Sequence, residues 1–139
     1  MDKQIVAQKL ESLRKCLLRI QDKSPEDAEL LVNNIDLQDI IALNLSRAVQ
    51  LSVDISAHLV SELNLAVPNT MGKVFDTIAE AGIISSEVAD SLKKAVGFRN
   101  IAVHNYERIN WLIVHAITHK NLADFKTFAK QISAYIDQK

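Results

Sequence analysis

The sequence is short of the residues that shape β-structure. Its 139 residues include only three glycines and two prolines, and no two hydrophobic runs are joined by Asn-Gly or Asp-Gly. Tight β-hairpins depend on such dipeptides because their turns need positive φ angles, which Gly and Asn tolerate. The scarcity of turn residues therefore argues against an antiparallel β-fold and favours helices.

Cysteine and long hydrophobic runs are also scarce. The one cysteine, Cys16, lies among leucines at helical spacing, which predicts a buried thiol and points to a reducing compartment. No apolar run approaches the roughly 18 residues that a membrane-spanning helix needs, and the first residues favour an amphipathic helix over a signal peptide. We therefore expect a cytoplasmic protein that makes no contact with a membrane.

Neither sign of charge is in excess. Sixteen Lys and Arg residues stand against 17 Asp and Glu residues, which gives a formal net charge of -1. The overall charge therefore provides no general attraction for nucleic acid, and any contact with RNA must use a local patch. The residues that the sequence offers for such a patch are Lys93, Lys94, Arg99 and Arg108.

What the sequence does contain is a strong helical pattern. Hydrophobic residues make up 48% of the chain, and its length is typical of one domain, so we expect a single domain over residues 1–139. Apolar spacing predicts helices over residues 2–22, 36–62, 71–81, 85–104 and 110–137, with a short turn of helix after Ser24-Pro25-Glu26-Asp27 and a kink near His119-Lys120-Asn121. The expected N-caps are Ser24, Asp36, Thr70, Ser85 and Asn110. Short connections make this an all-α, up-and-down bundle of four or five helices.

The long helix over residues 36–62 carries a polar stripe on a mostly apolar rod. Its members are Arg47, Gln50, Asp54 and Ser61, spaced so that they share one face. The stripe suits a solvated face and a cleft lining equally well, with Arg47 and Asp54 as the candidates for the cleft. An ion pair from Asp54 to Arg99 is a further hypothesis, because it would hold the guanidinium in place.

Chemistry-bearing residues are concentrated in the segment Arg99-Asn100-Ile101-Ala102-Val103-His104-Asn105-Tyr106. Metal-free RNA cleavage requires a proton to leave the 2′-hydroxyl, a proton to reach the 5′-oxygen, and stabilisation of the charged phosphorane between them. Histidine suits the proton transfers and arginine the charge, while a tyrosine adds a donor or a stacking face. Arg99, His104 and Tyr106 are thus the candidate functional residues.

Spacing limits how these residues can cooperate. On a regular helix Arg99 and His104 stand about 140° apart, so they serve one substrate only if the helix breaks between them or if two chains share the site. A break is plausible because polar residues follow and Asn110 can cap a new helix. Asn100, Asn105 and Arg108 flank the motif and are expected to line the same cleft.

The spelling R-x4-H-x-Y, within Gly97-Phe98-Arg99-Asn100-Ile101-Ala102-Val103-His104, resembles the signature of the HEPN superfamily and specifically its HepT toxin branch. The resemblance implies a metal-independent endoribonuclease toxin of a type VII-like toxin–antitoxin system, a homodimer that cleaves RNA, and no cofactor. It assigns catalysis to Arg99 and His104. It also implies a partner antitoxin, a nucleotidyltransferase of the MNT type, that adenylylates Tyr106. Asn105 stands where many members of the branch carry an acid.

Other readings remain open at this stage. His115 and His119 have the i, i+4 spacing of zinc ligands, but no cysteine or acid in register completes a set, so we expect no metal site and a solvated or interface face instead. The chain is alternatively a non-catalytic, nucleotide-binding or substrate-binding subunit of a two-component nucleotidyltransferase. A generic helical scaffold is a third interpretation, which predicts neither nucleotide binding nor a dimer around residues 99–106.

Overall fold

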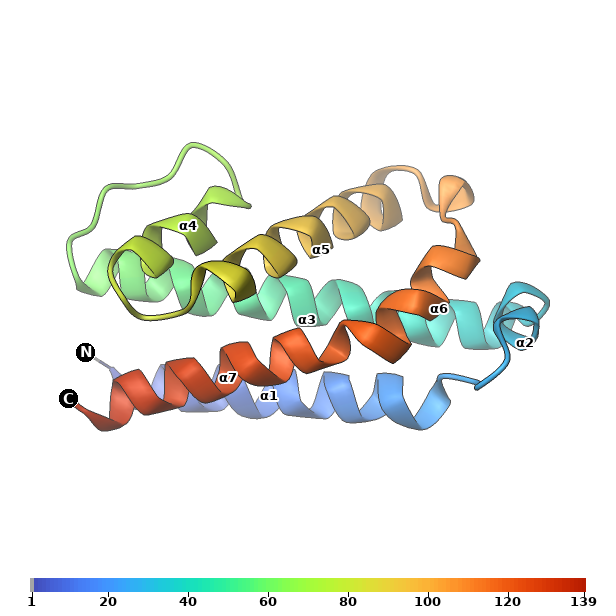
Figure 1. Ribbon diagram of the computed structural model, residues 1–139, viewed down its shortest axis with the longest axis horizontal. Helices are drawn as coiled ribbons and strands as arrows, with labels where there is room; N and C mark the ends of the chain where they lie inside the picture. Colours follow the sequence, from blue (N-terminus) through green and yellow to red (C-terminus); the bar gives the residue numbers. More distant parts are fainter. Residues whose placement is uncertain (1) are drawn as a thin grey trace.

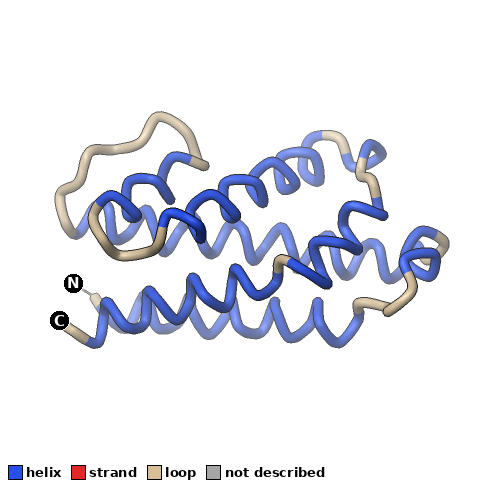
Figure 2. The backbone as a smooth tube through the Cα atoms, in the orientation of Figure 1, coloured by secondary structure: helices blue, strands red, loops and turns tan. Residues whose placement is uncertain are grey.

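The computed structural model describes residues 2–139, and every regular element in that part of the chain is helical. The elements are α1 (Lys3–Lys23), α2 (Ala28–Val32), α3 (Ile35–Glu62), α4 (Lys73–Glu80), α5 (Ser86–His104), the 3-10 turn η1 (Tyr106–Arg108), α6 (Trp111–Lys120) and α7 (Leu122–Asp137). Figure 2 shows the same elements joined by short loops, except for the longer connection between α3 and α4 over residues 63–72. The all-α fold class is confirmed.

Four long helices form the body of the molecule. Along the chain α1, α3, α5 and α7 run alternately in opposite directions (Figure 1), and each packs against its two neighbours in a closed ring. This is the expected up-and-down bundle. Helix α1 begins and α7 ends at one end of the bundle, whereas α2, η1 and α6 gather at the other.

Local capping explains where the helices begin. Ser85 and Asn110 cap α5 and α6 as predicted, because each side chain accepts a hydrogen bond from a backbone N–H of the first turn. Gly82 follows α4 with a φ of 79°, a left-handed conformation that is common just after a helix ends. The predicted kink is present as well, since Asn121 separates α6 from α7.

Two of the predicted caps are wrong. Asn34, and not Asp36, caps α3 by accepting from the N–H of Leu37. Ser24 ends α1, and its hydroxyl lies 2.7 Å from that of Thr118 on α6, while Asp27 caps α2. In both places a competing Asn or Asp was available nearby, and the packing of the chain decided which residue took the role.

The predicted cap at Thr70 is only partly realised. Its hydroxyl oxygen accepts from the N–H of Lys73 at 3.3 Å, but Gly72 occupies the N-cap position of α4. The helix therefore begins two residues later than the sequence suggested. Such differences at helix ends are small and leave the bundle unchanged.

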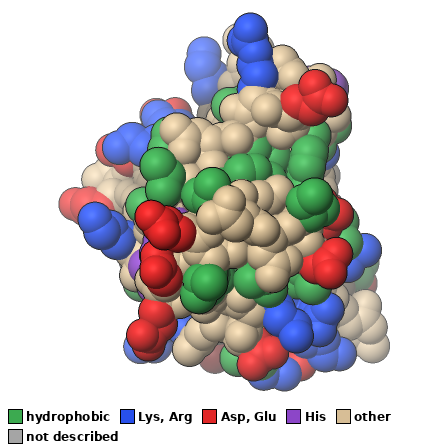
Figure 3. Space-filling view, turned by 90° about the vertical axis from the view of Figure 1, so that its right-hand side faces the viewer, with side chains coloured by type: hydrophobic (Ala, Val, Ile, Leu, Met, Phe, Trp, Pro, Cys, Tyr) green, Lys and Arg blue, Asp and Glu red, His purple; other side chains and the backbone are tan. Residues whose placement is uncertain are grey.

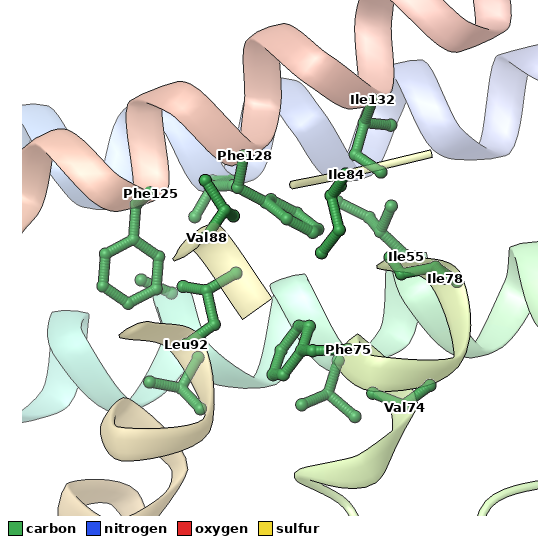
Figure 4. Close-up of a cluster of buried hydrophobic side chains, with 14 of the residues drawn as sticks. Ile55, Val74, Phe75, Ile78, Ile84, Val88, Leu92, Phe125, Phe128 and Ile132 are labelled. Atoms are coloured by element: carbon green, nitrogen blue, oxygen red, sulfur yellow. The ribbon is translucent and has the colours of Figure 1, made fainter. Parts of the chain in front are cut away.

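The apolar core runs along the inside of the bundle. Figure 4 shows part of it, where Phe75 of α4 and Phe128 of α7 meet edge to face with ring centroids 6.0 Å apart. Cys16 is only 8% exposed, as expected, and burial raises the pKa of its thiol. A buried, protonated thiol is poorly reactive, so Cys16 is part of the core.

A second, smaller cluster lies at the end that carries η1. Its buried members are Leu31, Ile41, Ala42, Ile109 and Val114, drawn from α2, α3, α6 and the residue after η1. Phe98 of α5 packs against both this cluster and the main core. The cluster fixes the chain as it leaves the 99–106 motif. Within residues 2–139 no helix is both long and apolar enough to cross a membrane.

Candidate active site

The motif residues lie where α5 ends. Helix α5 continues without interruption through Arg99 to His104, and the N–H of Asn105 still bonds to the carbonyl of Ile101. The chain leaves the helix only at Asn105, with φ -154° and ψ 62°. The predicted break therefore comes after His104 and not between Arg99 and His104.

The unbroken helix decides between the two alternatives left by the spacing. Arg99 and His104 are five residues apart on a regular helix, so their side chains leave the axis about 140° apart. One copy of the chain does not turn both groups toward one point. Of the two alternatives, a shared site between chains is the one that this geometry still allows.

Arg99 is half-buried beside the loop that leads into α4. Its Nη1 lies 3.9 Å from the sulfur of Met71, a weak acceptor. The hypothetical ion pair to Asp54 is not formed, because the Asp54 carboxylate accepts instead from Nε2 of Gln50 at 2.8 Å, one turn away on α3. Most N–H donors of the Arg99 guanidinium are therefore available to bind another group.

His104 has a different environment. It is exposed in the last turn of α5, and within residues 2–139 no hydrogen bond or ion pair engages its ring. Its neighbours Asn100 and Asn105 are exposed too. The imidazole is therefore accessible to a bound substrate.

Tyr106 is held by a residue that sequence reasoning missed. Its hydroxyl donates a hydrogen bond of 2.6 Å to Oδ1 of Asp39 on α3, 67 positions earlier in the chain. Its ring meets Trp111 edge to face, with centroids 5.8 Å apart. Burial raises the pKa of Tyr106, and the hydrogen bond and negative charge of Asp39 raise it further. No local signal marks Asp39, because only the fold brings α3 beside η1.

The other predicted cleft residues, Arg108, Arg47 and Asp54, lie in different parts of the molecule. Arg108 closes η1 and lines a cavity of about 470 Å³ between α5, α6 and α7, together with Lys94. Arg47 is exposed on α3, close enough to Cys16 of α1 for its charge to oppose the rise in that thiol's pKa. Asp54 lies half-buried on the same stripe. The cleft role of these residues stays a prediction.

The basic patch expected around the motif is partly engaged. Lys93 forms an ion pair with Asp76 at 3.1 Å and lies 3.7 Å from Asp90. Lys94 and Arg108 have no ion pair within residues 2–139. The cations left for a phosphate backbone are therefore Lys94, Arg99 and Arg108.

The end of the bundle that carries the motif is unusually apolar. Large exposed hydrophobic residues lie on α2, the start of α3, the end of α5 and the start of α6, and we name them the end patch: Leu30, Val32, Ile35, Ile101, Val103, Leu112 and Ile113. Figure 3 looks onto this end and shows several groups of hydrophobic side chains, separated by tan surface, with charged side chains around them. Large exposed apolar residues gathered at one end of a molecule are typical of surfaces that bind another chain.

The histidine pair of α6 is used for structure. Nε2 of His115 and Nε2 of His119 each lie 2.8 Å from the carbonyl oxygen of Pro25, and the ring centroids are 4.1 Å apart. In the tautomer protonated at Nε2 both rings donate to that one oxygen. They tie α6 to the loop between α1 and α2. Among residues 2–139 no group of three His, Cys, Asp or Glu residues is arranged to hold a metal ion.

Known proteins are similar to this chain over most of its length. The family model described as "Ribonuclease HepT-like" matches residues 8–132. The protein named "mRNA nuclease HepT" from Shewanella oneidensis is 34% identical over 131 residues, which cover 94% of this chain and 97% of that one. A protein named "tRNA nuclease HepT" from Aphanizomenon flos-aquae is 25% identical over 105 residues, 76% of this chain and 71% of that one.

A solved structure of a complex is similar over nearly the full length. It is described as a tri-AMPylated Shewanella oneidensis HEPN toxin in complex with MNT antitoxin; the fold matches with a TM-score of 0.88 at 34% identity, covering 96% of this chain and 99% of that one. The match therefore covers nearly the whole chain rather than the motif alone.

Proposed function

This chain belongs to the HepT-like ribonuclease family of HEPN proteins, and we propose that it is the toxin of a toxin–antitoxin pair, an endoribonuclease that cleaves RNA without a metal ion. One observation carries the proposal: Arg99 and His104 stand on an uninterrupted helix that ends in an exposed apolar surface. The chain acts as a homodimer in which these residues from two copies converge on one phosphodiester. The whole chain, residues 1–139, forms one HEPN domain.

The chemistry assigns a separate task to each group. His104 transfers protons, taking one from the 2′-hydroxyl and supplying one to the leaving 5′-oxygen as the two copies face each other. Arg99 places two parallel donors on the phosphate and stabilises the additional negative charge of the phosphorane. Lys94 and Arg108 contact the RNA backbone on either side.

The end patch supports the homodimer. Two chains related by a two-fold axis bury the same surface on each side, so a patch around the motif brings both copies of α5 together. The burial removes large apolar side chains from water, and that is the main driving force for association. The position of the patch at the motif makes dimerisation and assembly of the site one event.

The partner that silences the toxin is a nucleotidyltransferase of the MNT type, and it adenylylates Tyr106. The similar complex, described as a tri-AMPylated toxin with MNT antitoxin, supports this assignment. Tyr106 follows His104 by two residues and is 40% exposed, so a transferase can reach it. An attached AMP adds bulk and a phosphodiester anion to a site meant for the phosphate of RNA.

Purified protein incubated with RNA in EDTA tests the proposal. Cleavage should persist in the wild type and fall by about 10²–10⁴-fold in His104→Ala, because a positioned proton-transfer group is worth that much. The thermal midpoint of the variant should match that of the wild type, since His104 is exposed and makes no hydrogen bond or ion pair within residues 2–139. A fully active His104→Ala variant would contradict the proposal. RNA binding without cleavage by the wild type would favour the non-catalytic subunit of a two-component nucleotidyltransferase.

A further inference from the structure

Within residues 2–139, Asp39 is the one carboxylate in hydrogen-bond contact with the proposed modification site. Its Oδ1 accepts a hydrogen bond from the Tyr106 hydroxyl. The two oxygens lie 2.6 Å apart, a short distance typical of a hydrogen bond to an ionised acceptor. The edge of Trp111 packs on the phenol ring, so the hydroxyl has a fixed direction. The neighbouring Glu107 makes no such bond, and neither does Asp36, one turn earlier on α3.

Adenylyl transfer to a tyrosine has a proton to remove. The phenolic oxygen attacks the α-phosphorus of ATP, a new P–O bond forms, and the bond to pyrophosphate breaks. The products are the tyrosyl-AMP phosphodiester, pyrophosphate and one proton, which has to reach a base as the oxygen gives up its lone pair. A nucleophile within hydrogen-bond reach of a base is the arrangement that this step needs.

We propose that Asp39 accepts the phenolic proton of Tyr106 when that hydroxyl is adenylylated, so that the toxin itself carries the proton acceptor for its own modification. The inference rests on the proposed function, because it concerns the adenylylation of Tyr106. Asp39 would thereby set how fast the antitoxin silences the enzyme.

The environment of Tyr106 disfavours a reaction through free phenolate. Burial and the Asp39 charge raise the pKa of Tyr106, so free phenolate is scarce at neutral pH. Loss of the proton therefore has to accompany formation of the P–O bond, and Asp39 is the group in contact with that proton. The titratable groups nearest in sequence to these contacts are Asp36 on α3, His104 at the end of α5, and Glu107 and Arg108 in η1, while those of α6 are His115, His119 and Lys120.

The Asp39→Asn variant separates proton transfer from positioning. Its amide oxygen still accepts the tyrosine hydroxyl, but it does not take up a proton at neutral pH. The test mixes the full chain with its MNT-type nucleotidyltransferase partner and α-labelled ATP, and follows AMP incorporation from pH 6 to 10. Asp36→Asn is the matched control, because Asp36 is exposed on the same helix without a bond to Tyr106. Tyr106→Phe reports labelling at other residues.

The expected result is a loss of about 10²-fold or more in the labelling rate of Asp39→Asn at pH 7. In this variant the rate should rise tenfold per pH unit toward the tyrosine pKa, because only phenolate then reacts. The wild type and Asp36→Asn should give flat profiles over the same range. Circular dichroism checks that each variant keeps its helices.

Two outcomes overturn the inference while leaving the proposed function intact: labelling of Asp39→Asn at the wild-type rate, or slow labelling with a flat pH profile, which would reduce Asp39 to a positioning role. Absence of label on Tyr106 in the wild-type chain would instead refute the proposed modification, and the inference with it. Peptide mass spectrometry of the labelled chain distinguishes these cases.

Discussion

At the scale of single residues, the site depends on contrasts between neighbours. His104 is exposed and unengaged, Arg99 is half-buried against Met71, and Tyr106 is fixed by Asp39 and Trp111. The sequence predicted the three motif residues from their chemistry and spacing. It did not indicate Asp39, because an aspartate near the start of a long helix looks like any other solvated charge until η1 is packed beside it.

The Tyr106 hydroxyl should make stability depend on alkaline pH. Its pKa is higher in the folded protein than in the unfolded chain, so the folded state holds the proton more tightly. The stability that the protonated Tyr106 hydroxyl provides is fully present below the ordinary tyrosine pKa of about 10. It is lost as the pH rises above that value. Between pH 9 and 11 the wild type should therefore lose more unfolding free energy than Tyr106→Phe.

Urea unfolding at a series of pH values measures this difference. Tyr135 is present in both proteins, so the comparison isolates the effect of Tyr106. Equal slopes for wild type and Tyr106→Phe would mean that the contact with Asp39 does not persist in solution.

At the scale of elements, single capping residues determine where several helices begin, and the packing of the helices determines the other boundaries. Ser85 and Asn110 cap their helices as the sequence predicts. Asp36 and Ser24 do not cap the helices expected of them, because Asn34 and Asp27 are better placed once the helices pack. The uninterrupted end of α5 matters most for function, since it directs Arg99 and His104 to different sides.

Two glycines should respond to alanine in opposite directions. Gly82 has a φ of 79°, where a Cβ is strained, so Gly82→Ala should destabilise the protein by about 1–2 kcal/mol. Gly97 lies inside α5 with open space around the position of a Cβ, so Gly97→Ala should stabilise it by about 0.5–1 kcal/mol. Each variant is the control for the other, because both add one methyl group that meets no neighbour within 4 Å.

Chemical denaturation of the two variants provides the measurement. A destabilising Gly97→Ala would indicate that this exposed part of α5 is covered by another chain, and a neutral Gly82→Ala would mean that the α4–α5 turn relaxes without cost.

At the scale of the whole molecule, the fold carries the motif and the end patch on one end of the bundle, while α1 begins and α7 ends at the other. The two chemical groups diverge around α5, and the apolar surface beside them lacks a cover in the single chain. The proposed homodimer, with a second copy placed across the motif end, would account for both features.

Mixing two inactive variants tests whether the site is shared. Arg99→Ala and His104→Ala each remove one group, and equal mixing with free exchange gives half heterodimers. In a shared site the heterodimer keeps one Arg99 and one His104 on different chains, whereas each homodimer lacks one group entirely, so RNA cleavage by the mixture should exceed that of either variant alone. Recovery no greater than either parent alone would show that the groups do not work across two chains.

The sequence by itself determined the helical architecture and the identity of the motif residues. Helical periodicity, caps and the R-x4-H-x-Y spelling are properties of neighbours along the chain, and local physics is enough to interpret them. The tertiary structure decided what depends on distant segments: the continuity of α5 to His104, the contact of Tyr106 with Asp39, and the gathering of apolar residues from four helices into the end patch. Those features depend on which faces the bundle buries, and burial is fixed only when all the helices pack together.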